Sequence, residues 1–197
     1  MSGSKVCPTC GGPWMRSDDP VAKMVCEPSV LFDTEAFPPG ANQVYLFQRP
    51  IGQNDMAGYH KGYDDTNMVM AAQLACPLEF RVLGLRWLLP PDPEWRTAVA
   101  EALPHAVLEI DHGVDRELCA VAESIPIGDF SELVYTVENG RHRWQMGASA
   151  ENVYPFRMKL RWNESFCARL LWPGGRPPTG FRLRLAMVGH VCFPEGF

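Results

Sequence analysis

The cysteine pair in Cys7-Pro8-Thr9-Cys10-Gly11-Gly12 is the motif with the clearest chemistry in this chain. Two thiolates separated by two residues, with glycine after the second, form a tight turn whose backbone amides can hydrogen-bond metal-bound sulfur. A structural zinc site needs four ligands, and Cys26 is the next cysteine along the chain. The sequence therefore predicts a zinc half-site at Cys7 and Cys10, with Cys26 as a third ligand.

The fourth ligand of this zinc site is left open by the spacing. The residue three positions after Cys26 is Ser29, so the second half of a zinc ribbon is incomplete. His60, another cysteine or a residue of a neighbouring subunit could complete the site. The alternative is a reduced, exposed segment without metal. Redox chemistry is least favoured, because no alternation of strands and helices surrounds the pair.

No other pattern in the sequence indicates catalysis. The histidines form no His-x-His or His-x-x-x-His pair, so the metal site of a cupin-type enzyme is not indicated. Nucleophile-elbow, phosphate-loop and dinucleotide-binding motifs do not occur in the sequence. We therefore expect a protein that is not an enzyme. The five histidines are His60, His105, His112, His142 and His190.

The elements that would carry these residues are mostly strands. Residues 156–162 and 181–185 alternate apolar and basic side chains, a period of two that places one set in a core and the other on the opposite face. Asn139-Gly140 is a strong signal for a hairpin turn. Asp92-Pro93-Glu94 predicts the start of one short helix, which Pro104 ends.

The expected fold is all-β: an antiparallel β-sandwich of jelly-roll type with one short helix and an extended N-terminal arm. Residues 1–40 are rich in glycine, proline, serine and aspartate, which predicts an arm carrying the cysteine pair. Residues 41–197 would form the sandwich. The chain has 197 residues, a length that suits one main domain.

The net charge of −5 is distributed unevenly along the chain. From Glu151 onward seven basic residues face three acidic ones, a balance of +4 that leaves −9 for the rest. Like charges on neighbouring strands repel, so we expect carboxylates opposite the basic faces, within the chain or across a subunit contact. Nucleic acid is the alternative, indirect partner. The residues expected in charge pairs are Arg157, Lys159, Arg161, Arg182 and Arg184.

The N-terminus, Met1-Ser2-Gly3-Ser4-Lys5, lacks the apolar core of a signal peptide, and no apolar run is long enough to span a bilayer. We therefore expect no transmembrane segment, synthesis in a reducing cytoplasm, and cysteines that are thiols or metal ligands in preference to disulfides.

Several short phrases resemble jelly-roll capsid proteins of icosahedral, tail-less bacteriophages. They occur in order over about residues 42–192. They are 46–52, Lys61 with 65–68, Leu74 with Pro77 and Phe80, and 181–189. The resemblance implies a subunit without enzymatic activity that packs into trimers or pentamers of a virion shell with other virion proteins, its terminal arms reaching to neighbours or inward. The cysteine pair departs from that family.

A carbohydrate- or protein-binding β-sandwich module without catalysis is the alternative function. The six tryptophans could stack on sugar rings in a carbohydrate-binding β-sandwich, although core packing explains tryptophans in sheets equally well.

Overall fold

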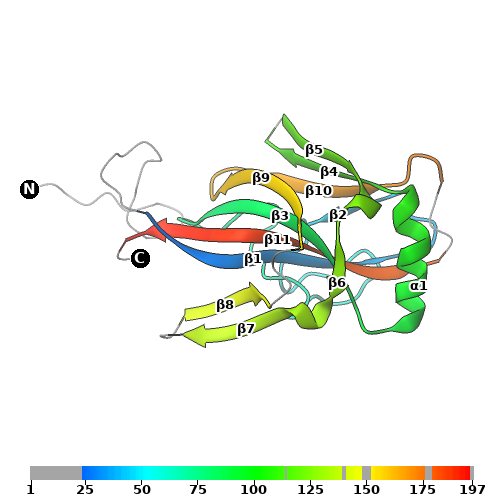
Figure 1. The fold of residues 1–197 in the computed structure, drawn as a ribbon, viewed down its shortest axis with the longest axis horizontal. Helices are drawn as coiled ribbons and strands as arrows, with labels where there is room; N and C mark the ends of the chain where they lie inside the picture. Colours follow the sequence, from blue (N-terminus) through cyan, green and yellow to red (C-terminus); the bar gives the residue numbers. More distant parts are fainter. Residues whose placement is uncertain (1–23, 114, 139–140, 148–151, 176–178, 196–197) are drawn as a thin grey trace, which may run out of the picture.

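The computed structural model describes residues 24–113, 115–138, 141–147, 152–175 and 179–195. Most of them lie in strands, and the expected all-β sandwich with one short helix is confirmed (Figure 1). The elements are β1 (Met24–Phe37), β2 (Gln43–Leu46), β3 (Glu79–Leu89), α1 (Pro93–Ala102), η1 (Leu103–His105), β4 (Val107–His112), β5 (Asp115–Val121), η2 (Ala122–Ser124), β6 (Ile127–Asp129), η3 (Phe130–Glu132), β7 (Leu133–Glu138), β8 (Arg141–Met146), β9 (Tyr154–Arg161), β10 (Phe166–Leu171) and β11 (Phe181–Pro194).

Two sheets form the sandwich. The larger has the order β1-β11-β3-β6, with β9 also paired to β3, and the smaller has the order β2-β10-β4-β5. The antiparallel pairs β1 with β11, β2 with β10, β3 with β9, and β4 with β5 are nested inside one another along the chain. The β7–β8 hairpin forms a separate two-stranded sheet.

The main core lies between the two sheets, and a smaller one lies outside the larger sheet. The main core includes Leu46, Trp87 and Leu185, all with no exposed surface. The smaller one joins Val30 and Phe32 on β1 to the β7–β8 hairpin through Trp144 and Met146. Helix α1 covers one end of the sandwich, away from the end where β1 begins and β11 finishes (Figure 1).

The helix and the hairpin form as their sequence signals predict. Asp92 caps α1, accepting hydrogen bonds from the backbone nitrogens of Glu94 at 2.8 Å and Trp95 at 3.3 Å. Glu138 pairs with Arg141 across the two-residue connection that joins β7 to β8. Among the described residues, no helix is both long and apolar enough to cross a membrane.

The arm boundary expected at residue 40 needs correction, because residues 24–37 belong to the sandwich. Strand β1 pairs along its whole length with β11, and its second half is buried. Pro28, Asp33 and Glu35 interrupt the apolar pattern and made this segment resemble a loop. The rest of the expected arm before β1, residues 1–23, lies outside the described residues.

Candidate functional site

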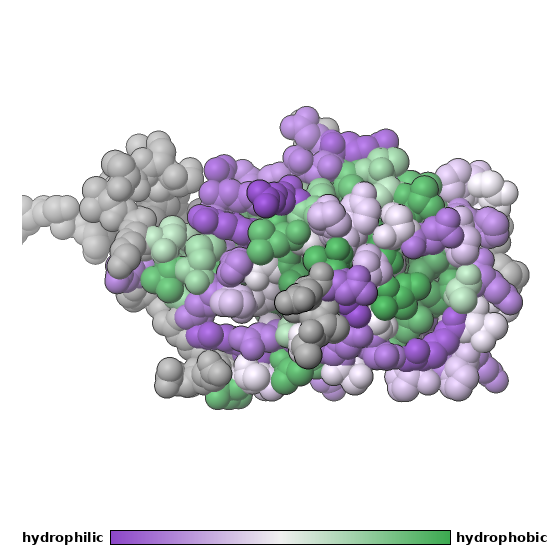
Figure 2. Space-filling view, in the orientation of Figure 1, coloured by the Kyte–Doolittle hydropathy of each residue, from purple (hydrophilic) through white to green (hydrophobic). Residues whose placement is uncertain are grey.

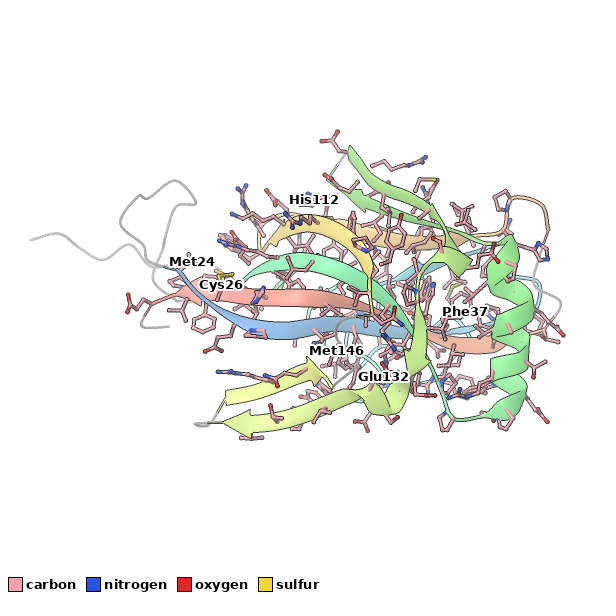
Figure 3. The ribbon with its side chains drawn as sticks, viewed as in Figure 1. Met24, Cys26, Phe37, His112, Glu132 and Met146 are labelled. Carbon is pink, nitrogen blue, oxygen red and sulfur yellow. A yellow bond between two sulfur atoms is a disulfide. The ribbon has the colours of Figure 1, made fainter. Side chains whose placement is uncertain are left out.

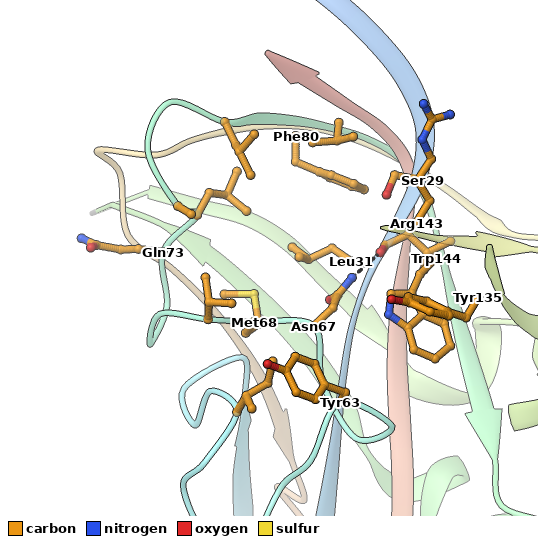
Figure 4. Close-up of a pocket in the computed structure, with 17 residues that line it drawn as sticks. Ser29, Leu31, Tyr63, Asn67, Met68, Gln73, Phe80, Tyr135, Arg143 and Trp144 are labelled. Carbon is orange, nitrogen blue, oxygen red and sulfur yellow. Dashed lines mark hydrogen bonds between the residues drawn. The ribbon is translucent and has the colours of Figure 1, made fainter. Parts of the chain in front are cut away.

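A groove of about 640 Å³ runs beside β1 and is here called the β1 groove (Figure 4). The segment between β2 and β3 forms one wall through Met68 and Leu74, and the β7–β8 hairpin forms the other through Tyr135 and Trp144. Phe80 lies deeper in the groove, at the start of β3. The volume is that of a site for a small ligand or for a few side chains of a partner.

Aromatic and aliphatic side chains at the rim of this groove reach the surface. Tyr63 is 73% exposed, Val69 is 61% exposed and Tyr135 is 49% exposed. Tyr135 packs against Trp144 with ring centroids 5.0 Å apart, and this contact orients both rings. Figure 2 shows further apolar side chains along the lower edge of the molecule, over the β7–β8 hairpin, where Val134 and Val137 are exposed.

The polar side chain of Asn67, which lies between the groove walls, makes hydrogen bonds to the backbone of β1. Its Oδ1 accepts from the Phe32 backbone nitrogen at 2.9 Å, and its Nδ2 donates to the Val30 carbonyl at 2.7 Å. These bonds satisfy backbone groups at the edge of β1 that does not pair with β11. The groove is therefore suited to apolar and stacking contacts.

A buried charge cluster, formed by Asp33, Glu35 and Lys61, lies on the inner side of β1. All three side chains are at most 1% exposed. Lys61 Nζ is 2.5 Å from Asp33 Oδ1 and 2.9 Å from Glu35 Oε1. Asp33 and Glu35 are two residues apart on one strand, so both point to the same face. Lys61 comes from the segment between β2 and β3 and joins that segment to β1.

Backbone groups hold the two carboxylates of this cluster in place. The Phe47 nitrogen donates to Asp33 Oδ2 at 2.6 Å, and the Met56 nitrogen donates to Glu35 Oε2 at 3.1 Å. Arg49 lies 3.4 Å from Glu35 Oε1. Burial, only partly offset by Lys61, raises the pKa of Asp33 to about 6, which increases the neutral fraction of its carboxyl group.

Two arginines of β11 lie close to this region. Arg182 pairs with Asp65, and Arg184 Nε donates to Thr34 Oγ1 at 2.8 Å. The Arg184 guanidinium also stacks on Phe130, 3.9 Å from the ring centroid. Burial lowers the pKa of Arg184 to about 10. Both arginines tie β11 to the rest of the molecule.

The five basic residues expected in charge pairs meet different surroundings. Lys159 lies 2.7 Å from Glu79, Arg161 lies 3.2 Å from Glu164, and Arg182 pairs with Asp65. Arg184 bonds to a hydroxyl and a carbonyl instead, and no carboxylate pairs with the exposed Arg157 in the described part of the chain. Strand β3 lies between β9 and β11, which keeps their basic faces apart.

The third ligand expected for zinc has a different role. Cys26 forms a disulfide with Cys192 (Figure 3). The expectation that Cys26 binds a metal is therefore wrong, and so, for this pair, is the expectation that the cysteines are thiols or metal ligands in preference to disulfides. The two residues face each other on β1 and β11, a proximity that the sequence does not reveal. Cys7 and Cys10 lie outside the described residues, so zinc binding there stays a prediction.

Histidines do not gather into a metal site in the described residues, where no group of three or more metal-binding side chains is found. His60, expected as a possible fourth ligand, is exposed on a loop. His112 Nε2 lies 3.0 Å from Oε2 of Glu164, the same carboxylate that pairs with Arg161.

Neither the charge cluster nor the groove was predicted from the sequence. Asp33 and Glu35 stand at alternate positions in the run from Val30 to Phe37, a pattern that requires a buried cation nearby. That signal was available. The groove walls come from segments far apart in the sequence, so no local pattern marks the groove.

Comparison with protein-family models, curated proteins and solved structures gives no match to this chain.

Proposed function

We propose that this chain is a non-enzymatic jelly-roll subunit that assembles with copies of itself into a closed shell, as in a virion capsid. The observation that carries the proposal is the nested pairing of β1 with β11, β2 with β10, β3 with β9, and β4 with β5. An eight-stranded antiparallel hairpin folded over once into two sheets gives this order. Double-sheet jelly rolls serve as capsid, lectin and cupin domains.

Two features favour the capsid among these three classes. The described residues hold no group of three or more metal-binding side chains, so this part of the chain offers no support for a cupin-type metal site. Exposed apolar side chains occur on β7 at Val134, Tyr135 and Val137, and large exposed apolar patches mark contacts between proteins. A shell subunit covers such surfaces on assembly.

A carbohydrate-binding module is the second candidate, and the aromatic rim of the β1 groove favours it. Tyr63 and Tyr135 present partly exposed rings that could stack on a sugar. Titration of the protein with a glycan panel, followed by tryptophan fluorescence, tests this function, because Trp144 lines the groove beside Tyr135. Saturable quenching that a Tyr135→Ala variant loses would favour the binding module.

Electron microscopy of the purified full chain tests the proposed shell. Closed particles or capsomer-sized oligomers are the expected result. A stable monomer at high concentration would overturn the proposal. Nuclease treatment at low salt adds a second test: particles that survive digestion depend on protein contacts, whereas dissociation identifies nucleic acid as the partner of the basic residues.

A further inference from the structure

We propose that Lys61 and Asp33 condense to an amide inside the folded protein, with Glu35 transferring the protons. This self-modification would be independent of shell assembly. It assigns a covalent function to the buried charge cluster, a cross-link between β1 and the segment that precedes β3.

The three side chains are already in direct contact. Lys61 Nζ is 2.5 Å from Asp33 Oδ1 and 2.9 Å from Glu35 Oε1, so one amine touches both the group it would attack and a base. Groups held in this way react as one molecule, which removes the entropy cost of bringing them together.

The second oxygen of Asp33 has a donor suited to the reaction. The Phe47 backbone nitrogen donates to Asp33 Oδ2 at 2.6 Å, where negative charge develops when the amine adds to the carboxyl carbon. Phe47 adopts a φ of 65°, unusual for a residue with a side chain, and this conformation belongs to the turn that places its N–H there.

Burial places all three side chains in surroundings of low polarity. The side chains of Asp33 and Glu35 have no exposed surface, and that of Lys61 is 1% exposed. The raised pKa of Asp33 increases the fraction of its carboxyl group that is protonated and open to attack. Condensation also removes two buried charges, which are costly in a medium of low polarity.

The reaction balances without any other reactant. The Lys61 ammonium gives one proton to Glu35, and the nitrogen lone pair adds to Cγ of the protonated Asp33 carboxyl group, so that the N–Cγ bond forms. Glu35 then delivers this proton to the Asp33 hydroxyl oxygen, Oδ1, the Cγ–Oδ1 bond breaks, and the oxygen leaves as water. The nitrogen gives its second proton to Glu35, which ends protonated and neutral. The products are an amide and one water molecule, with no change in oxidation state.

Mass spectrometry of the intact, reduced full chain tests the proposal directly. Reduction opens the Cys26–Cys192 disulfide, so that bond adds nothing to the mass difference. We expect the protein to be lighter than its sequence mass by about 18 Da, the mass of one water. A mass equal to that of the sequence would overturn the proposal.

Peptide mapping locates the bond. Trypsin does not cut before Pro50, and it cannot cut after a lysine whose amine is in an amide. The linked protein should therefore give residues 24–81 as one peptide that is lighter by one water. Further cleavage between residues 33 and 61 should leave the two fragments joined. Release of a free peptide ending at Lys61, or loss of water at another residue, would contradict the bond.

Variants separate the chemistry from simple burial. Glu35→Gln retains the size and polarity of Glu35 but cannot carry the proton, and Lys61→Arg retains the charge but lacks the reactive amine. Both should fold, as judged by circular dichroism, and both should show the full sequence mass. Asp65→Asn, which changes a nearby carboxylate paired with Arg182, should keep the loss of water. Loss of water that persists in folded Glu35→Gln would overturn the role of Glu35.

Discussion

Cys26 and Cys192 face each other on the two longest strands and form a disulfide between positions 166 residues apart. The bond joins the first strand of the larger sheet to the last, at the end of the sandwich away from α1 (Figure 3). Because disulfides form and persist in oxidising surroundings, finding this bond in purified protein would indicate that the chain had been exposed to oxidising conditions.

Reduction of this disulfide should destabilise the protein. Closing so long a loop restricts the unfolded chain, and disulfides typically contribute about 2–4 kcal/mol. A reducing agent should therefore lower the denaturant midpoint of the wild type, but should not lower that of a Cys26→Ser/Cys192→Ala variant further. Cys119→Ser, a change at an exposed thiol, should behave like the wild type. Equal midpoints with and without reductant in the wild type would show that the bond does not form.

Gly189 lies at a close approach between β11 and β3. The register between the strands shifts there, and a Cβ atom at Gly189 would overlap the carbonyl oxygen of Arg81. Gly189→Ala should lower the free energy of unfolding by about 1–3 kcal/mol, since the strands must move apart. Gly174→Ala, with no atom within 4 Å of the added Cβ, serves as the control and should have little effect. Equal stability of the two variants would contradict the close approach.

The pair of Glu79 and Lys159 should give a stability that depends on pH and salt. Burial raises the pKa of Glu79, but hydrogen bonds from Lys159 and Arg81 outweigh it and lower the pKa below the usual 4.5. A lowered carboxyl pKa stabilises the fold above pH 4.5, and this contribution disappears as pH falls through the native pKa.

Glu79→Gln should therefore cost at most about 1 kcal/mol at pH 7 and low salt, because both cations are half-exposed. The difference from the wild type should shrink at pH 3 and in high salt, measured by thermal unfolding. Glu123→Gln, at an exposed site, provides the control. A cost that persists at pH 3 would assign the effect to packing instead of charge.

The elements that the sequence predicts correctly are those whose sequence signals lie within a few neighbouring residues. Alternation over β9 and β11, the capping residues of α1 and the hairpin signal between β7 and β8 act within a few residues, and the sequence is sufficient to find them. β1 was missed because Asp33 and Glu35 point into the core and need Lys61, which lies 26 residues or more away. The disulfide, the groove and the choice of Lys61 as the cation of the cluster arise from contacts between distant segments, which no window of sequence displays.

The free edge of β7 should take part in assembly. β7 pairs only with β8 among the described strands, and Val134, Tyr135 and Val137 on it are 45–57% exposed. An apolar edge without lysine or proline offers a site for another chain. Val137→Lys adds a charge there without disturbing the core, so the protein should stay folded while the oligomers seen in analytical ultracentrifugation shift toward monomer. Ala100→Lys, on the exposed face of α1, adds the same charge elsewhere and should leave assembly unchanged. If Val137→Lys assembles as well as Ala100→Lys does, β7 lies outside the subunit contacts.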